Sequence, residues 1–276
     1  MRRLNTLFLA PQKLAVVQKE IVARGLSWYQ DIFLVNEYPK SGGTWLKLML
    51  SEALDMPAWT KVNPQWGSCV MQAHWLHKRG RCRTITLFRD GRDIMVSLYY
   101  HSFFRNEFQN AAYTEYMKKR FRFKDFSDIR SNLPEFMKIT FDNPVSPGFN
   151  WADFVNNWTG RDDVVACSYE DLRSDTPRTL VKIVLELTGH KLSYERAVAI
   201  SESHSIENMR KRFAEENALS KQSNNVEVSF LRKGVVGGWS GSFSDEALDW
   251  FETRAGDALD VLGYKRGRPN LEGTLN

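Results

Sequence analysis

Cysteine is scarce in this sequence of 276 residues: there are three, Cys69, Cys82 and Cys167. An odd number at these spacings fits neither a disulfide framework nor the ligand pattern of a structural zinc site. We therefore expect a reducing compartment and no bound metal.

Long apolar runs are also absent. No stretch approaches the roughly 18–20 apolar residues that a membrane span requires. The N-terminal segment imitates a signal peptide only faintly, because Pro11 and Lys13 interrupt its short apolar part. These absences predict a soluble protein of the cytoplasm with no membrane partner.

Positive charge is only slightly in excess of negative charge, and the formal net charge is +5. A modest basic balance suits an acidic ligand such as a nucleotide, but it does not identify one. The only dense basic cluster, residues 118–124, is interleaved with phenylalanine. We interpret it as a solvated helix face or a lid rather than a nucleic-acid surface, so no nucleic-acid partner is expected.

The sequence is 42% hydrophobic, which is enough for one large core. Apolar runs alternate with helical patterns, which predicts an α/β fold with a mainly parallel central sheet flanked by helices. The expected strands cover residues 32–37, 69–73, 84–88 and 164–168. The expected helices cover residues 44–54, 92–104, 176–188, 194–201, 205–213 and the segment after Ser244. We expect a single domain, residues 1–276, in which an insertion at 101–150 forms a lid or part of an acceptor pocket.

The last of these helices carries the clearest end signals. Ser244 is a suitable N-cap, and Gly263 is a suitable stop. The apolar residues between them fall on one stripe, formed by Leu248, Phe251, Ala255, Leu259 and Leu262.

The most informative segment is residues 38–45, Tyr-Pro-Lys-Ser-Gly-Gly-Thr-Trp. It lies between a buried strand and a helix. Its glycines allow backbone N–H groups to converge, and the helix N-terminus adds partial positive charge. The segment therefore predicts an anion cradle, although an ordinary strand–turn–helix junction could have the same pattern.

The segment lacks Gly-x-x-x-x-Gly-Lys-Ser/Thr, the loop of nucleotide kinases, and its lysine precedes the glycines. It resembles instead the phosphosulfate-binding loop of sulfotransferases that use 3′-phosphoadenosine 5′-phosphosulfate (PAPS). The resemblance implies that the loop holds the 5′-phosphate, that Lys40 stabilises charge on the bridging oxygen and that Trp45 stacks on adenine. The implied donor-binding residues are Lys40, Ser41, Gly42, Gly43, Thr44 and Trp45.

A second match begins where the strand at 84–88 ends. Arg89 can bind a phosphate bidentately, and Ser97 follows eight residues later. This pair resembles the site for the 3′-phosphate of PAPS in the same family. The alternative is a surface arginine paired with Asp90 or Asp93.

A third match lies near the C-terminus, where Arg-Lys-Gly-x-x-Gly-x-Trp spans residues 232–239. Its cations and glycine form a loop able to close over an anion. The segment resembles the family's other 3′-phosphate clamp, which implies that Arg232, Lys233 and Gly234 bind the donor. By itself it could be any basic, glycine-rich turn.

His74 follows the strand at 69–73. Ligands of open parallel sheets bind beyond the carboxyl ends of the strands, where Lys40 and Arg89 are also expected. The resemblance implies that His74 is the general base. His77 and His101 remain competitors.

Two further segments match the family less closely. Tyr169 begins a Tyr-Glu-Asp segment that lies near adenine in these enzymes. Ile206 stands where the family usually has an aromatic residue that stacks on the base.

The chain departs from the pattern elsewhere. Gln72 replaces a lysine of the soluble mammalian-type enzymes, and the family's C-terminal dimerisation signature is missing, so the oligomeric state is open. Gly43 and Gly238 each replace a larger residue, which is expected to affect loop dynamics more than chemistry.

The resemblance implies transfer of a sulfuryl group from PAPS to a hydroxyl or amine of a small-molecule acceptor, with PAP as the other product. The basic aromatic segment 101–150 leaves both apolar and acidic acceptors open, including natural products of secondary metabolism. Two alternatives remain: a P-loop kinase or other phosphoryl transferase, and a non-catalytic nucleotide-binding module.

Overall fold

The computed structural model describes residues 16–60, 64–78, 82–105, 111–219 and 234–268. The chain forms two compact units, each built from separate segments. The first contains the chain up to Glu37, Gly42–Leu87 and Gly160–His204. The second contains Tyr38–Ser41, Phe88–Thr159 and the chain from Ser205 onward.

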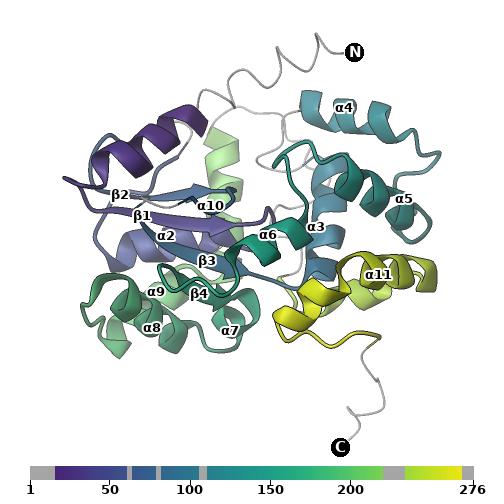
Figure 1. The fold of residues 1–276 in the computed structure, drawn as a ribbon. Coiled ribbons are helices and arrows are strands. Elements are labelled where there is room, and N and C mark those ends of the chain that lie inside the picture. The colour runs from purple at the N-terminus through teal and green to yellow at the C-terminus, as the bar shows by residue number, and fades with distance from the viewer. Residues whose placement is uncertain (1–15, 61–63, 79–81, 106–110, 220–233, 269–276) are drawn as a thin grey trace, which may run out of the picture. The chain divides into compact units, whose positions relative to one another are not determined.

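The first unit contains the central sheet (Figure 1), with the strand order β2-β1-β3-β4. Strand β1 (Ile32–Glu37) pairs in parallel with β2 (Cys69–Ala73) on one side and β3 (Arg83–Phe88) on the other. Strand β4 (Val165–Ser168) completes the sheet beside β3. Every residue of β1 is buried, as a central strand with both faces covered requires.

Helices cover both faces of this sheet. Helix α2 (Gly43–Ala53) packs on β1 and β2, and α8 (Thr176–Thr188) and α9 (Tyr194–Ser203) pack beside it. The helical segment that ends in η1 (Val22–Leu26) lies on the opposite face against β1 (Figure 1). The short helix α7 (Tyr169–Ser174) leads from β4 into α8.

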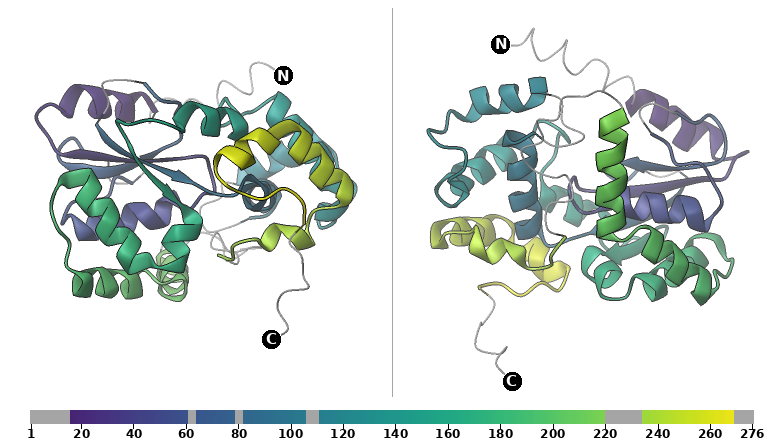
Figure 2. Two further views of the ribbon diagram at one scale, coloured as in Figure 1. Left: turned by 60° about the horizontal axis from the view of Figure 1, so that its bottom comes forward. Right: turned by 180° about the vertical axis from the view of Figure 1, so that it is seen from behind.

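The second unit is helical (Figure 2). Helix α3 (Gly91–Phe103) contacts α4 (Ala111–Phe121), α5 (Ile129–Asp142) and the turn η2 (Gly238–Gly241). Helix α11 (Asp245–Val261) packs on α5 and on α6 (Trp151–Trp158). Helix α10 (Ile206–Leu219) belongs to the same unit. The aromatic core of this second unit includes edge-on contacts of Phe103 with Phe121 and with Phe136.

The predicted α/β architecture is confirmed. Strands β1 and β2 have the predicted bounds, and β3 and β4 each differ by one residue at the start. The Ser244 side chain accepts the Ala247 N–H as an N-cap, and Gly263 adopts a φ of 79° after α11. The predicted end of α10 at residue 213 is wrong, because the helix continues to Leu219.

The cysteines Cys69, Cys82 and Cys167 are buried, and none of these three forms a disulfide. Burial raises the pKa of the Cys69 thiol to about 11. In the described ranges no helix is both long and apolar enough to cross a membrane. The same ranges contain no group of three or more His, Cys, Asp or Glu side chains placed to hold a metal ion.

Candidate active site

The turn into α2 requires both of its glycines. Gly42 has a φ of 104°, and a Cβ atom there would lie 2.8 Å from the Tyr169 ring. A Cβ atom at Gly43 would overlap the Glu37 carboxylate. The backbone of this turn is therefore bare, as the close approach of an anion to the start of a helix requires.

The entrance to the turn is fixed within the second unit. Lys40 has a φ of 77°, an uncommon conformation for a residue with a side chain. The Ser41 hydroxyl is buried and donates to the Tyr38 carbonyl at 2.8 Å. The Lys40 carbonyl accepts a hydrogen bond of 3.0 Å from the Arg89 guanidinium. These contacts fix the backbone at Lys40 and connect it to the second motif.

A carboxylate that sequence analysis missed occupies the cradle. Glu37 is only 2% exposed, and its Oε2 accepts the Gly43 N–H at 2.5 Å. Its Oε1 accepts from Gln72 at 2.6 Å, and Gln72 in turn accepts from the Thr44 hydroxyl at 3.2 Å. The groups predicted to hold a 5′-phosphate therefore bind internal partners in this structure. An acidic residue directly before Tyr-Pro-Lys, together with Gln72, was the available signal.

The Glu37 carboxylate also interacts electrostatically with the buried Lys47 side chain. Lys47 on α2 donates to the Trp59 carbonyl at 3.2 Å. Burial lowers the pKa of Lys47, and the nearby Glu37 carboxylate partly offsets this effect. A negative charge thus lies beside the positive end of α2, where it favours the helix but opposes a second anion.

We expect Glu37→Gln to tighten PAP binding by about fivefold or more, because a charge that competes with the phosphate for the Gly43 N–H is removed. The same change should lower the unfolding midpoint by a few degrees, since the amide is a poorer partner for the start of α2. Titration calorimetry and thermal unfolding measure the two effects.

The control for this variant is Glu186→Gln on the exposed surface of α8, where the carboxylate pairs with Lys182. It should change neither quantity appreciably. Weaker PAP binding in Glu37→Gln would contradict the prediction and would make the carboxylate a structural part of the cradle.

The tautomer of His74 follows from its contact with the backbone. Its Nδ1 lies 3.0 Å from the Glu37 carbonyl oxygen. A carbonyl oxygen can only accept, so Nδ1 carries the proton and the lone pair is on Nε2. This is the tautomer that a general base acting through Nε2 requires.

The competing histidines are placed differently. The Nε2 atom of His77 lies 2.9 Å from the Asp163 carboxylate, so His77 takes part in a side-chain ion pair. His101 is in the last turn of α3, with its ring 6.0 Å from that of Tyr113.

Arg89 lies just before α3, which begins at Gly91. Asp93 and Ser97 are four residues apart on that helix and therefore lie on the same side of it. The Arg89 side chain is 11% exposed and lies 3.8 Å from Asp93. The alternative pairing of Arg89 with Asp93 is therefore present, although the arginine side chain is mostly buried rather than on the surface. Pairing with Asp90 is not found among the described residues, because Asp90 binds Arg92 at 2.8 Å.

The third motif lies against the second. The Arg89 guanidinium donates to the Val235 carbonyl at 3.4 Å, and the Asp93 carboxylate accepts the Gly237 N–H at 2.8 Å. Gly234 has a φ of 63° in the same turn. Arg232 and Lys233 lie outside the described residues. Segments far apart in the sequence thus come together around Arg89.

The aromatic residues of the proposed adenine site are buried in the first unit. The Trp45 indole N–H donates to the His204 carbonyl at 2.8 Å, and its ring meets Tyr169 edge-on at 6.2 Å. The Arg173 guanidinium lies 5.7 Å from the Trp45 ring. Ile206 is the half-buried first residue of α10. Stacking of Trp45, Tyr169 and Ile206 on adenine stays a prediction.

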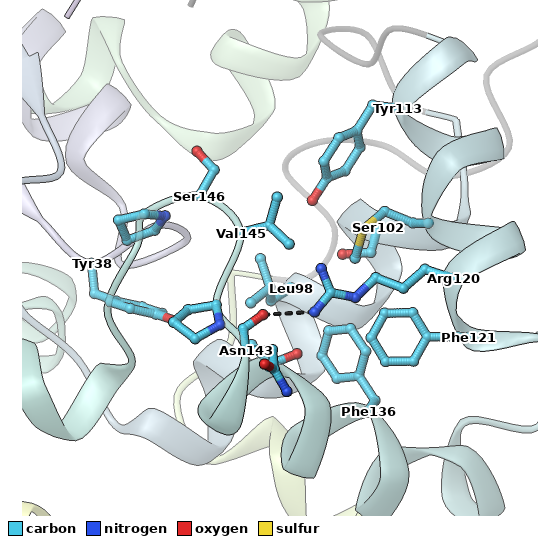
Figure 3. A pocket seen from close by; sticks show the side chains of 14 residues that line it. Tyr38, Leu98, Ser102, Tyr113, Arg120, Phe121, Phe136, Asn143, Val145 and Ser146 are labelled. Atoms are coloured by element: carbon cyan, nitrogen blue, oxygen red, sulfur yellow. Dashed lines mark hydrogen bonds between the residues drawn. The ribbon is translucent and has the colours of Figure 1, made fainter. Parts of the chain in front are cut away.

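The second unit also contains a pocket between α3, α4, α5 and the segment 143–147 (Figure 3). Tyr38, from the start of the loop, forms one wall. Aromatic rings and the Arg120 guanidinium supply much of the rest. The pocket therefore reaches the residues that directly precede Lys40.

A family model described as the sulfotransferase domain matches residues 69–262, more than half of the chain. The chain belongs to the sulfotransferase family. It is 26% identical over 267 residues to the 3-beta-hydroxysteroid sulfotransferase of Cavia porcellus, with 81% of the chain and 84% of the relative covered. It is 24% identical over 283 residues to human sulfotransferase 2A1, with 90% and 89% covered.

Solved sulfotransferase structures share the fold. Mouse sulfotransferase SULT7A1 complexed with PAP superposes with a TM-score of 0.62 at 19% identity, over 90% of this chain and 95% of that one. Retinol dehydratase in complex with androsterone and PAP gives a TM-score of 0.60 at 16% identity, over 87% and 83%. At these identities the likeness shows the architecture alone.

Proposed function

We propose that this sulfotransferase moves a sulfuryl group from PAPS to a hydroxyl or amine of a small-molecule acceptor. One observation carries the proposal: Arg89 connects the loop and the 3′-phosphate motifs. Its guanidinium binds the Lys40 carbonyl and the Val235 carbonyl, beside Asp93 and Gly237. A nucleotide that carries a 3′-phosphate as well as a 5′-phosphate requires an anion site at each of these motifs.

The residues present fit this donor. The turn at Gly42 and Gly43 carries no side chain of its own, so a 5′-phosphate has to displace only the Glu37 carboxylate from the Gly43 N–H. Arg89 with Ser97, and Arg232 with Lys233 and Gly234, are the proposed 3′-phosphate clamp. When bound, the donor supplies the sulfuryl group and a PAP leaving group.

His74 is the proposed general base. With its Nδ1 proton held by the Glu37 carbonyl, Nε2 accepts the proton of the acceptor's O–H or N–H group as the new bond to sulfur forms. Lys40 offsets the negative charge that develops on the departing oxygen, and the N–H groups of residues 41–44 bind the 5′-phosphate. In this proposal His74 takes the acceptor's proton and Lys40 offsets the charge on the departing oxygen. The proposed step uses no metal ion.

The two alternatives are less well supported. A P-loop kinase needs a lysine after the glycines, whereas Lys40 precedes them. A non-catalytic module would not need a histidine held in the tautomer of a base, as His74 is. Membership of the sulfotransferase family also favours transfer over either alternative.

The proposed acceptor site is the pocket of the second unit, so that residues 101–150 serve acceptor binding within a single sulfotransferase domain. Its closeness to Lys40 through Tyr38 supports this assignment. The names of the relatives include steroid sulfotransferases, and one solved neighbour is complexed with androsterone. Small molecules with a rigid ring system are therefore the first acceptors to test.

The experiment that tests the proposal is incubation with PAPS and single acceptors of each class: a phenol, a sterol and an aromatic amine. Formation of PAP together with an acceptor heavier by one SO₃ group would support it. Tight PAP binding without transfer to any acceptor would favour the non-catalytic module.

We expect Arg89→Ala to weaken PAP binding by about tenfold or more, since a charge-assisted hydrogen bond to a phosphate is lost together with a contact that holds the loop. Titration calorimetry measures the affinity. Arg178→Ala on the exposed surface of α8 is the matched control and should bind PAP normally. Unchanged PAP affinity in Arg89→Ala would remove Arg89 from the clamp.

A further inference from the structure

We propose that the acceptor of this enzyme carries an anionic group, such as a carboxylate or sulfate, and that Arg120 binds this group in the pocket of the second unit. The inference rests on the proposed function, because it names the acceptor class for the same reaction. It is carried by the placement of one cation among aromatic walls and hydroxyl groups.

The pocket has a consistent chemical character. Its walls are largely aromatic and aliphatic, with Tyr38, Leu98, Phe121 and Phe136 among them (Figure 3). Such walls fit a planar or partly apolar body, as small-molecule sites commonly do.

Arg120 is the cation of this pocket. Figure 3 shows its guanidinium directed into the space between Asn143, Ser102 and the rings of Phe121 and Phe136. It donates to the Asn143 carbonyl at 2.6 Å and lies 5.9 Å from the Phe121 ring centre. Neither contact neutralises its charge, because a carbonyl and a ring are both uncharged.

The nearby acidic residue that could neutralise Arg120 is engaged elsewhere. Asp142, at the end of α5, forms an ion pair of 3.0 Å with Arg254. Within the described segments of the chain, no Asp or Glu lies within ion-pair distance of Arg120. A half-buried guanidinium with donors to spare recognises carboxylate, sulfate or phosphate groups well.

Neighbouring hydroxyl groups extend the donor set. Ser102 and Tyr113 line the pocket on the same side as Arg120 (Figure 3). Burial raises the pKa of the Tyr113 phenol, more than the neighbouring Ser102 and Arg120 lower it. The phenol therefore stays protonated near neutral pH and can donate to an anion.

The position of Tyr38 sets the direction of the acceptor. Tyr38 lies two residues before Lys40 and forms the loop side of the pocket, whereas Arg120 comes from α4. We therefore infer that the reacting hydroxyl or amine faces the loop and that the anionic group faces α4. Carboxylated or already sulfated aromatic alcohols have this arrangement.

The test compares a matched pair of phenols, 4-hydroxyphenylacetate and its primary amide, in wild type and in Arg120→Gln. Wild type should prefer the carboxylate by about tenfold or more in kcat/KM, mostly through KM. Arg120→Gln should abolish this preference and leave kcat/KM for the amide, as well as PAP affinity, close to wild type. Lys119→Gln, which changes an exposed lysine of the same helix, should retain the preference.

Several results would overturn the inference. One is an equal kcat/KM of wild type for the two phenols. Another is an equal loss of kcat/KM for both phenols in Arg120→Gln, as expected for a structural arginine. A third is weaker PAP binding in Arg120→Gln. If neither phenol is sulfated, equilibrium binding of the pair to the protein decides: binding of the carboxylate that Arg120→Gln abolishes supports the inference, and its absence overturns it. PAP binding, measured separately, shows whether the proposed function itself has failed.

Discussion

Replacing Lys40 by alanine is expected to reduce sulfuryl transfer by about 10²-fold or more while the chain stays folded. Lys40 directly precedes the Ser41–Gly42–Gly43 turn in the sequence, and its carbonyl accepts a hydrogen bond from Arg89. The substitution keeps the backbone and the Cβ atom, so the carbonyl contact and the left-handed conformation at a φ of 77° are retained. What is lost is the charge that offsets the developing negative charge on the departing oxygen.

The loss should appear mainly in kcat rather than in PAP affinity, because that charge develops in the transition state. Steady-state kinetics with PAPS and calorimetry with PAP separate the two. Lys182→Ala, at an exposed position on α8, is the control for a lysine removed elsewhere. Equal losses in kcat and PAP affinity would contradict the account and would make Lys40 a binding residue only.

His74→Ala should also lower kcat by about 10²-fold or more, because the acceptor's proton then has no positioned base. The contact between Nδ1 and the Glu37 carbonyl fixes the ring at the end of β2, and its removal leaves the sheet pairing unchanged. A rate that rises with pH in wild type, and rises less in the variant, would be consistent with a base. The measurement is the pH profile of kcat for both proteins.

Variants of the other histidines serve as controls. His77→Ala breaks an ion pair with Asp163, and the histidine hydrogen bond is the main cause of the lowered pKa of that carboxyl. It should affect stability more than turnover. Near wild-type turnover in His74→Ala, together with a large loss in His77→Ala or His101→Ala, would transfer the role of base to the other histidine.

The strands were predictable because their apolar runs are bounded by strong signals. The run at Ile32–Glu37 ends at the Tyr-Pro-Lys turn, and the run at Cys69–Ala73 ends at His74. Local pattern decides such boundaries. The end of α10 was not predictable from its apolar residues, since the helix continues beyond Phe213 through alanine and glutamate, which favour helices without a buried stripe.

The motifs of the site were visible in the sequence, but their internal partners were not. The contact of Arg89 with Lys40 joins residues 49 positions apart, and that of Asp93 with Gly237 joins residues 144 apart. The occupation of the Gly43 N–H by Glu37 depends on a side-chain conformation that no spacing rule supplies. Related soluble enzymes have a lysine where this chain has Gln72. In this structure the Gln72 amide donates a hydrogen bond to the buried Glu37 carboxylate, which gives that carboxylate a neutral partner.

The most direct test of the central claim is calorimetric titration of the protein with PAP, beside ADP in the presence of magnesium. The account predicts tight PAP binding that needs no magnesium and much weaker ADP binding. The reason is that the proposed clamp, formed by Arg89, Ser97, Arg232, Lys233 and Gly234, is assigned to a 3′-phosphate that ADP lacks. Equal or tighter binding of ADP that depends on magnesium would contradict it and would favour a kinase-like enzyme.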